Sequence, residues 1–566
     1  MRPAGRGALE SLYFDYPVFP FRRPPELDGD SAQHPVVIAG AGPVGLVAAI
    51  ALAQYGIASV LLERKNTVND GSRAICVSRH SFETLQQLGV VAPFLAKGLG
   101  WTRGRCYYRD QLIYQLEMPH SEQERFLPMY NIQQQFIEQY LIDKAGEYPD
   151  LIDLRWQSEV LDVETNADGV SLEIGTPQGL YTLRGKYLLA ADGARSNIRD
   201  LLGLRLSGEN LPGNYVIADV RMQHDFPTER RSFFESSGNP DATVLVHRQP
   251  DNIWRVDWQI TLQDDPEEAV REANVRERVQ AILQMIGHEG EWELEWWSIY
   301  TANTLCLDEY RHGRVLFIGD SAHIVPIFGV RGLNNGIADA VNAAWKLAFV
   351  LRGRAAETLL DSYSPERRGA TLDVFRNAGK SSRFMTPPTR GYALLRKAVL
   401  ELALTEEFTR PFADPRQVQP YTYGDSALTT ADEDGAKFAA GPAPGAALPN
   451  SRLAEDDYLL DHLGPGFALL YFSARSDPSP ELTELLAVLL GIDPQITLLR
   501  IGGTPGPATG HDVLVDMSGS IGAALDGADG TIYLVRPDRH VAGRWKSPDV
   551  GRVSSAMRRA LGEATG

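Results

Sequence analysis

Apolar and polar positions divide the chain into segments of two kinds. Short continuous apolar runs, each followed by a turn and an Ala- or Leu-rich stretch, predict buried parallel strands that lead into helices. The runs are 35–39, 187–191 and 315–318, and the helices after them are expected at 46–55, up to 202 and at 337–351. Residues 243–247 and 254–260 instead alternate, which is typical of antiparallel strands with one buried face. The pattern predicts an α/β domain into which a mostly antiparallel sheet is inserted.

The length of 566 residues exceeds what a single hydrophobic core supports, so several domains are expected. Changes in the hydrophobic pattern indicate where the boundaries between these domains lie. We expect an extended arm over the surface (1–33), the first part of the α/β domain (34–205), the inserted sheet (206–300), the second part of the α/β domain (301–380), a helical segment and linker (381–434), and a compact C-terminal domain (435–566).

Composition narrows the classes of partner. A net charge of −18 without a basic stripe disfavours nucleic acid and anionic membranes. The longest apolar runs, such as 47–53, are too short to cross a bilayer, and prolines and arginines interrupt the N-terminus, so no signal peptide is expected. Cys76, Cys106 and Cys306 lie too far apart for a disulfide framework or a metal cluster. We therefore expect a soluble cytoplasmic protein without a metal, and a homodimer stays open.

The first glycine turn carries the features of a nucleotide site. Gly40 permits a tight turn, Gly42 lets a pyrophosphate approach the backbone, and Gly45 allows the helix to pack closely on the strand. The start of that helix presents unpaired N–H groups to phosphates. Glu63 ends the second strand, where a carboxylate accepts from ribose hydroxyls. These residues predict a dinucleotide site without deciding between NAD and FAD.

Two later turns are weaker evidence for a ligand site when each is taken alone. Asp192-Gly193 ends a strand before a helix, and a turn glycine with a helix-capping Asp would explain it equally well. Gly319-Asp320 also ends a strand, but the glycines at 329, 332 and 336 then lead directly into a long helix. Such glycines let the backbone lie against a flat or anionic ligand, with the positive end of the helix dipole directed at it.

In this order and at these separations, the three motifs resemble the class A, single-component flavoprotein aromatic hydroxylases. The nearest branches are the 3-(3-hydroxyphenyl)propionate, pentachlorophenol and phenol hydroxylases, some of which carry a thioredoxin-like C-terminal domain. The resemblance covers residues 34–380 and reaches the tail through 533–542. It implies a Rossmann-like FAD-binding domain with an inserted substrate sheet, followed by a thioredoxin-like domain that here contains no cysteine and so cannot perform dithiol chemistry.

The resemblance also implies an activity. NADPH or NADH would reduce FAD, and O2 would react through a flavin hydroperoxide to hydroxylate a phenolic ring. The matching positions imply that FAD is bound by Gly40, Gly42, Pro43, Gly45, Glu63, Arg64, Arg73, Gln134, Asp192, Gly193, Gly319, Asp320, Pro326, Gly332, Leu333 and Asn334.

One position departs from that pattern. Many relatives have Gly-Gln-Gly where this chain has Val330-Arg331-Gly332, and Pro-Pro at 326–327. The guanidinium of Arg331 either faces the flavin or the substrate or is a surface charge, and the sequence leaves both open.

The catalytic residues are harder to predict. A His, Tyr or acid on the inserted sheet is expected to take the phenolic proton, and His247, Tyr215 and Arg255 are the candidates for proton transfer and anion binding. Polar residues that alternate along a strand also mark the wet face of a sheet. Pro326 is expected beside the isoalloxazine ring, whereas His323 is expected to hydrogen-bond the backbone of the flavin loop.

Other functions fit parts of the pattern. A halogenase of this scaffold carries a Trp-x-Trp-x-Ile-Pro segment, which the cluster at 292–297 does not match. An alkene reductase or a flavin-binding protein without activity stays open, while an NAD dehydrogenase leaves 319–336 unexplained. Neither the aromatic substrate nor the choice between NADH and NADPH can be read from the sequence.

Overall fold

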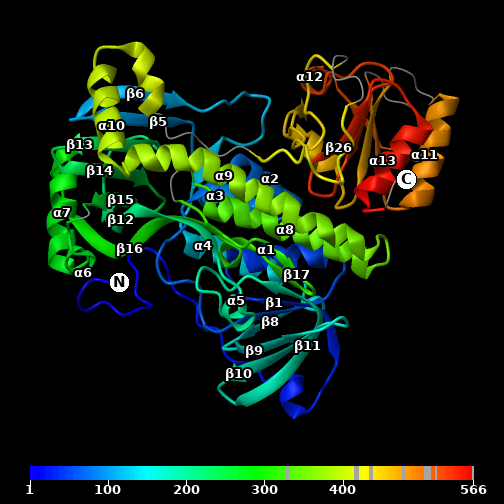
Figure 1. Ribbon diagram of the computed structural model, residues 1–566, viewed down its shortest axis with the longest axis horizontal. Helices are drawn as coiled ribbons and strands as arrows, with labels where there is room; N and C mark the ends of the chain where they lie inside the picture. The colour runs from blue at the N-terminus through cyan, green and yellow to red at the C-terminus, as the bar shows by residue number, and fades with distance from the viewer. Residues whose placement is uncertain are drawn as a thin grey trace.

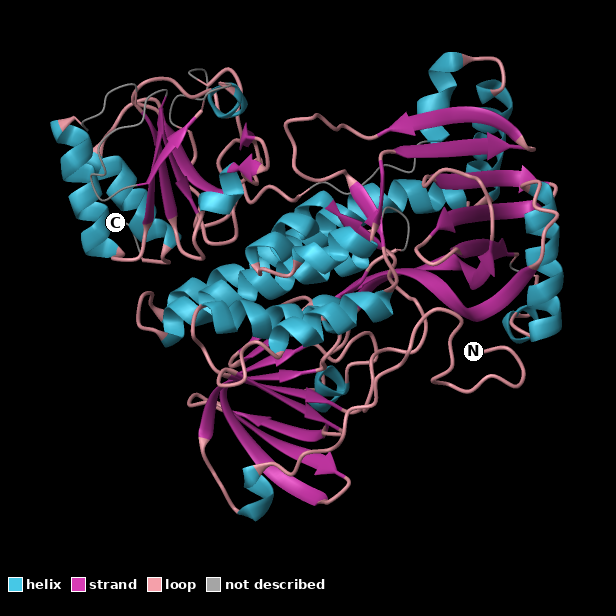
Figure 2. Cartoon of the chain, turned by 180° about the vertical axis from the view of Figure 1, so that it is seen from behind, coloured by secondary structure: helices cyan, strands magenta, loops and turns pink. Residues whose placement is uncertain are grey.

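The computed structural model describes residues 1–261, 263–326, 330–413, 420–432, 438–473, 479–502, 512–516 and 519–563. Three bodies are visible in Figure 1: a sheet at the bottom with helices across the middle, a second sheet at the upper left and a C-terminal domain at the upper right. Figure 2 shows the same arrangement from behind.

The first sheet is the predicted parallel core. Its apolar strands are buried on both faces, as parallel strands covered by helices must be. β1 lies between β2 and β11 and is parallel to both. The order is β17 (Arg311–His312), β18 (Val315–Phe317), β11 (Gly179–Ala190), β1 (Gln33–Ala39), β2 (Ser59–Glu63) and β8 (Ile152–Trp156), with β10 (Val170–Thr176) and β9 (Glu159–Thr165) extending β11 as an antiparallel hairpin.

Helix α1 (Pro43–Gln54) packs against both α4 (Gln134–Ala145) and α8 (Gly332–Leu351) over this sheet. α1 has no polar face because it is enclosed almost completely. α8 begins five residues before the predicted start at 337. Gly332, Asn334 and Gly336 are poor helix formers, but tertiary hydrogen bonds from the Asn334 side chain hold the first turn in place.

The second sheet extends beyond the predicted 206–300. It includes two strands from the first part of the α/β domain and one from the second part. The order is β19 (His323–Ile324), β16 (Trp292–Cys306), β12 (Ser207–Met222), β15 (Ile253–Ile260), β14 (Asn239–Arg248), β13 (Arg230–Ser236), β5 (Arg103–Tyr108) and β6 (Gln111–Glu117). All pairs are antiparallel except β13 with β5. The predicted antiparallel sheet is present, but its boundaries were too narrow.

The alternative that the polar residues of this sheet mark a solvent-exposed face does not hold. Every residue of β15 is buried. α7 (Glu272–Met285) covers one face with an apolar core, and the opposite face looks into the cavity described below. Polar alternation therefore marks a lined cavity here instead of solvent.

Smaller elements connect these bodies. They are η1 (Pro25–Asp28), β3 (Cys76–Ser78), α2 (Arg79–Gln87), α3 (Val91–Lys97), β4 (Leu99–Trp101), β7 (Met129–Asn131), α5 (Asn197–Leu201), α6 (Pro266–Ala269), η2 (Gly319–Ser321), η3 (Glu357–Ser362), α9 (Tyr363–Met385), α10 (Arg390–Ala403) and η4 (Glu407–Ala413). The N-terminal arm is more than a surface cover, because Phe14 is buried and Arg2 forms an ion pair with buried Glu295 at 2.5 Å.

The C-terminal domain is a five-stranded sheet in the order β24 (Asp512–Val515), β23 (Thr497–Gly502), β22 (Ala468–Phe472), β25 (Ile532–Val535) and β26 (Val541–Trp545). β22, β23 and β24 are parallel, whereas β25 and β26 add an antiparallel hairpin. The other elements are β20 (Arg452–Ala454), β21 (Asp457–Tyr458), η6 (Leu459–His462), α11 (Pro480–Ile492), α12 (Ser520–Ala524) and α13 (Val550–Ala560). The thioredoxin-like assignment stays a prediction.

Two observations concern the whole described chain. Within it, no helix is both long and apolar enough to span a bilayer. All three cysteines are buried and none is joined in a disulfide.

Candidate active site

A cavity of about 550 Å³ lies between the carboxyl ends of the parallel strands and the second sheet. All but three of the predicted FAD residues line it: Gly40, Gly42, Pro43, Glu63, Arg64, Arg73, Gln134, Asp192, Gly193, Asp320, Pro326, Gly332 and Leu333. The three motifs, far apart in sequence, therefore meet at one edge of the sheet, where α/β proteins bind their ligands.

The glycine turn has the geometry that a dinucleotide site requires. Gly40 has φ +104°, and a Cβ there would lie 2.4 Å from the Ala191 carbonyl oxygen. At Gly45 a Cβ would lie 2.0 Å from the Gly40 carbonyl oxygen, so close packing of helix on strand excludes any side chain. A Cβ on Gly42 would meet no atom within 4 Å, because this position faces the open cavity. Gly45 thus shapes the site without lining it.

Glu63 stands beside this turn at the end of β2. One carboxylate oxygen accepts from the Ala41 N–H and the other from the Lys65 N–H, both at 3.0 Å. The two backbone donors fix the orientation of the carboxylate, and the remaining lone pairs face the cavity.

Two more carboxylates face the cavity from the other motifs. Asp192 Oδ2 accepts from the Ile198 N–H at 3.1 Å, while its buried Oδ1 has no partner in the described structure. Burial raises the pKa of Asp192, and hydrogen bonds from Ser196 and Ile198 oppose that shift. Asp320 has surface open to the cavity, and the enclosing protein raises its pKa against the attraction of His323 and Arg73.

Gln134 is already engaged by the protein. Its carbonyl oxygen accepts from the Ala74 N–H at 3.0 Å, and its amide donates to Glu138 at 2.8 Å. Burial raises the pKa of Glu138 to about 7. Gln134 therefore orients the segment that carries Arg73 as well as lining the cavity.

The second sheet forms the opposite wall of the cavity. Arg230, His247, Arg255 and Asp219 stand opposite one another on β13, β14, β15 and β12, and form one row across the sheet. Asp257 lies two residues beyond Arg255 on the same face. All of these except Asp219 line the cavity.

Comparison with known proteins assigns the chain to a family. The model of the FAD binding domain family matches residues 33–378. The chain belongs to this family. The unsatisfied oxygen of Asp192, the open Gly42 and the fixed carboxylate of Glu63 fit the phosphates and ribose hydroxyls of FAD. FAD as the predicted cofactor is confirmed, and so is the predicted class of FAD-dependent aromatic hydroxylase.

Individual relatives agree with this class. The chain is 26% identical over 540 residues to a 3-(3-hydroxy-phenyl)propionate/3-hydroxycinnamic acid hydroxylase of Mycolicibacterium smegmatis, with 92% of each chain covered. It is 30% identical over 372 residues to the protein of that name from Klebsiella pneumoniae, with 64% of each covered. Among solved structures, the flavin-dependent monooxygenase PieE shares the fold with a TM-score of 0.75 at 23% identity, covering 94% of this chain and 100% of PieE. Aklavinone-11 hydroxylase gives 0.72 at 22% identity, with coverage of 94% and 100%.

Asn334 does not line the cavity of this flavoprotein, contrary to prediction. Its side-chain oxygen accepts from the Ser78 N–H at 2.9 Å and the Ser81 hydroxyl at 2.7 Å. Its amide donates to the Cys76 and Val330 carbonyl oxygens. The side chain ties the first turn of α8 to β3 and α2, so its contribution is structural.

His323 and Gly319 are also outside the cavity lining. His323 was expected to bond the backbone, but its Nε2 lies 2.6 Å from Asp339 Oδ2, and the pair is fully buried. The Gly319 N–H donates to the same oxygen at 3.0 Å. Asp339, which the sequence did not single out, therefore holds the turn that presents Asp320.

The predicted catalytic residues of the flavoprotein separate into three cases. His247 lines the cavity, its Nδ1 has no described partner, and burial together with Arg230 and Arg255 lowers its pKa well below the usual value. Arg255 lines the cavity too, but its guanidinium forms an ion pair with Asp219 at 2.9 Å, so its charge is already compensated. Tyr215 lies outside the lining, and its hydroxyl is 2.8 Å from Thr386 Oγ1.

Arg255 also reaches the FAD wall. Its guanidinium donates to the carbonyl oxygens of Ser72 and Arg73. The residue thus joins the second sheet to the loop that bears Arg73, which explains why a cation is buried at this point.

Three residues that the sequence did not predict complete the wall formed by the second sheet. Burial raises the pKa of Asp257 to about 7, and its Oδ1 has no described partner. Arg230 is buried and forms no ion pair with any residue that the structure describes. The buried hydroxyl of Tyr300 is also without a described partner. Alternation in 254–260 placed Asp257 on the same face as Arg255, but only Arg255 was named as a candidate.

Arg331 is a cavity residue and not a surface charge. It is only 5% exposed, lines the cavity beside Pro326 and forms no ion pair within the described chain. Burial lowers its pKa. Residues 327–329, including Gly329 of the predicted loop, lie outside the described structure.

Proposed function

We propose that this flavoprotein hydroxylates a phenolic ring bearing an anionic group, with NADPH or NADH as the reductant and O2 as the oxygen source. The observation that carries the proposal is the composition of one cavity. FAD-binding loops form one wall, and Arg230, His247 and Asp257 face them from the other. FAD, when bound, accepts hydride and activates dioxygen.

The FAD wall would hold the cofactor in parts. The Gly40–Gly45 turn and the start of α1 would meet the pyrophosphate, and Glu63 the ribose of the adenosine half. Asp320 and Arg73 would contact the flavin chain, and Pro326 with the start of α8 would lie beside the ring. The helix dipole of α8 favours negative charge at that edge.

Asp257 is the residue that we propose as the base. A ring carbon becomes electron-rich when the phenol loses its proton, so the protein must hold an acceptor near the hydroxyl. A carboxyl group with a pKa of about 7 accepts and releases protons near neutral pH. His247, kept neutral by its surroundings, can donate to or accept from the same hydroxyl.

Arg230 supports an anionic group on the substrate. A buried guanidinium without a counter-ion is unfavourable, and a ligand carboxylate would compensate it. The relatives from Mycolicibacterium smegmatis and Klebsiella pneumoniae are named for hydroxylated aryl acids, which supports the same class of substrate.

Apolar side chains complete the substrate wall. Ile217 and Leu245 flank Asp257 in the same row of the sheet and line the cavity. They can pack against an aromatic ring and keep water away from the reacting atoms.

The test is a panel of hydroxyaryl acids and neutral phenols, scored for NAD(P)H oxidation and oxygenated product together. We expect hydroxyaryl acids to stimulate oxidation and to yield product in near-equal amount. If every compound released only hydrogen peroxide, the proposed substrate class would be wrong. If no compound stimulated NAD(P)H oxidation while the protein held FAD, the protein would be better interpreted as a reductase or an inactive flavoprotein.

A further inference from the structure

The loop of residues 69–74 brings Arg73 to the cavity. It contains no helix or strand of its own. Arg73 is exposed and lines the cavity, and its charge opposes the rise that burial causes in the pKa of Asp320. Because the loop is irregular, the position of the Arg73 guanidinium depends on what holds the backbone around it.

Contacts from inside the molecule hold the second half of this loop. Arg255 donates to the carbonyl oxygens of Ser72 and Arg73. The Ala74 N–H donates to the Gln134 side chain at 3.0 Å. The two residues before this half, 70 and 71, are held by a different part of the chain.

The N-terminal arm provides the hydrogen bonds to Asp70 and Gly71. Arg2 Nη2 donates to Asp70 Oδ1 at 2.6 Å and to the Tyr16 hydroxyl at 2.7 Å. The Gly71 N–H donates to the same Tyr16 oxygen at 3.3 Å. Gln135 of α4 donates to this oxygen at 3.0 Å, so Tyr16 joins the loop to α4.

The other side of the Arg2 guanidinium reaches β16. Its Nη1 donates to Glu295 Oε1 at 2.5 Å, and the two side chains are only 6% and 1% exposed. Glu295 also accepts from Arg6 at 2.9 Å and from the Leu12 N–H at 2.8 Å. Arg6 donates further to backbone carbonyl oxygens of β16. Arg2 and Arg6 thus share one buried carboxylate, but only Arg2 extends to the loop.

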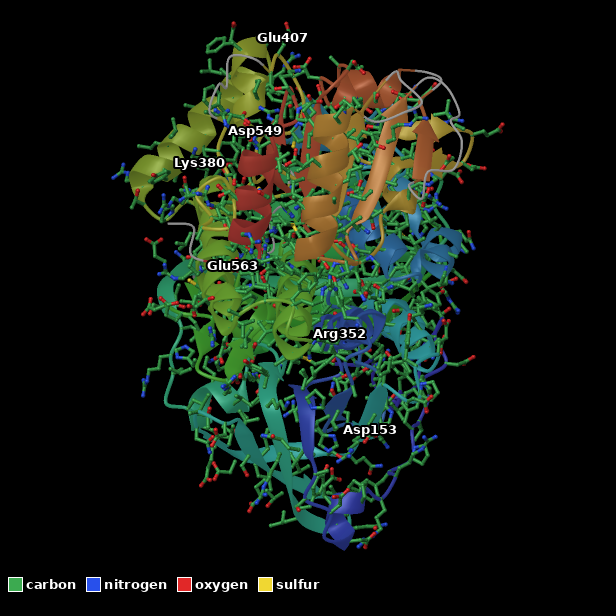
Figure 3. All side chains as sticks on the ribbon, turned by 90° about the vertical axis from the view of Figure 1, so that its right-hand side faces the viewer. Asp153, Arg352, Lys380, Glu407, Asp549 and Glu563 are labelled. Atoms are coloured by element: carbon green, nitrogen blue, oxygen red, sulfur yellow. The ribbon has the colours of Figure 1, made fainter. Side chains whose placement is uncertain are left out.

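Aromatic contacts anchor the arm at two points. Phe14 is buried and meets Phe136 of α4 edge to face, with the ring centroids 5.1 Å apart. Phe19 stacks on Trp156 of β8 at a centroid distance of 4.2 Å. Figure 1 marks the N-terminus beside β16, and Figure 3 shows the dark-blue arm passing Asp153 of β8. The arm is therefore fixed to the body of the protein next to its contacts with the loop.

We propose that the N-terminal arm is a strap that sets the position of Arg73 toward FAD, with Arg2 and Tyr16 as its positioning residues. A loop that is already ordered loses less conformational freedom when its cation meets an anionic cofactor, so the strap favours binding. This inference rests on the proposed contact between Arg73 and FAD, and it is independent of the substrate that is hydroxylated.

The first experiment measures the dissociation constant of FAD, by titration of the flavin-free full chain, and the free energy of unfolding of the same samples. Arg2→Met should raise the dissociation constant on the order of tenfold, as expected when a charged hydrogen bond is lost. Asp70→Ala removes the same contact from the exposed side of the loop and should have a similar effect.

Arg6→Met is the matched control, because it takes a cation from the same Glu295 carboxylate without touching the loop. It should lower the free energy of unfolding but change the FAD dissociation constant by less than about twofold. Equal effects of Arg2→Met and Arg6→Met on FAD binding would mean that the arm only stabilises the fold, and would overturn the proposal.

The second experiment combines substitutions. Arg73→Met alone should raise the FAD dissociation constant roughly 10- to 100-fold. In that background Arg2→Met should have no further effect, because the strap acts through Arg73. Effects that multiply, or an unchanged constant in Arg2→Met or Asp70→Ala, would refute the strap. An unchanged constant in Arg73→Met would instead refute the proposed contact with FAD, and the inference with it.

Discussion

Arg367 donates from Nε to Asp339 Oδ1 at 2.6 Å, and the other oxygen of the same carboxylate holds Gly319 and His323. Arg367 also donates to the Asn335 side-chain oxygen at 2.6 Å. One buried pair thus connects α9 to both the turn before Asp320 and the first turn of α8. Burial alone would raise the pKa of Asp339, but Arg367 and His323 hold it below its usual value.

We predict that Asp339→Asn both destabilises the fold and weakens FAD binding. Removing the charge leaves the Arg367 guanidinium buried without a counter-ion, which costs about 3–5 kcal/mol. Urea unfolding and an FAD titration measure the two effects. The control is Asp361→Asn, an exposed partner of Arg311, which should change neither by more than about 0.5 kcal/mol. Unchanged FAD affinity in Asp339→Asn would contradict a role in the flavin loop.

The C-terminal domain meets the same region through Arg536. Its guanidinium donates to both oxygens of Glu366, at 2.6 and 2.9 Å, and to Asp538 at 2.6 Å. Glu366 neighbours Arg367 on α9, and Arg367 donates to the hydroxyl of Tyr423 at 2.6 Å. The domain therefore inserts a buried charge network between α8 and α9.

We expect Arg536→Met to lower stability by about 3–5 kcal/mol, because Glu366 and Asp538 lose their shared cation in a buried site. Arg354→Met is the matched comparison, since Arg354 also joins the two domains, through Asp493 at 2.6 Å, but at a partly exposed position. Its effect should be about 1 kcal/mol. Denaturant unfolding, monitored by the release of flavin, compares the stabilities of the two variants. Equal effects would mean that the network has no special role.

The raised pKa of Asp257 predicts that the rate of hydroxylation depends on pH. If it takes the phenolic proton, kcat/KM rises as the pH passes through about 7, where the carboxyl group ionises. Asp257→Asn should lower the rate by roughly 10²–10⁴-fold and remove that rise. The exposed Asp264→Asn serves as the control. A variant that keeps the wild-type profile would show that another group is the base.

The same carboxyl group affects stability. Its folded-state pKa lies above the unfolded value, so its contribution is full below about pH 4 and is lost as the pH rises through 7. Asp257→Asn should remove this decline. Unfolding free energies measured between pH 4 and 8 provide the comparison.

Arg230 predicts a substrate-dependent effect. Arg230→Met should raise KM for a hydroxyaryl acid on the order of 10²-fold, because a buried ion pair is lost. For the matching neutral phenol KM should change little. Steady-state kinetics with both compounds make the comparison, and equal changes in KM would argue against an anion site.

Val330 predicts a stabilising substitution. Its φ of +61° lies in the left-handed region, which a β-branched side chain strongly disfavours. Val330→Gly should raise the free energy of unfolding by roughly 1 kcal/mol, and Val325→Gly, a neighbour in the cavity wall, should lower it. Loss of stability in Val330→Gly would mean that apolar packing at this site outweighs the strain.

The sequence alone determined the FAD part of this protein. Local geometry specifies this part, because a tight turn requires glycine and a ligand at a strand end requires a carboxylate. The residues concerned are those of the turn from Gly40 to Gly45, together with Glu63, Asp192 and Asp320. Parallel strands then bring these ends to one edge. Residue types and spacing thus predicted a dinucleotide site, and the resemblance of the three motifs to the flavoprotein hydroxylases implied FAD and the family.

Tertiary structure decided the substrate wall and its supports. Arg230, His247 and Asp257 come from three strands, and only the register between those strands brings them together on one face of the sheet. Asn334 was predicted to contact FAD and Asp339 was not singled out, and only packing gave each its distant partner. Whether a polar side chain faces water or a buried cavity depends on what covers the sheet, and no local pattern contains that information.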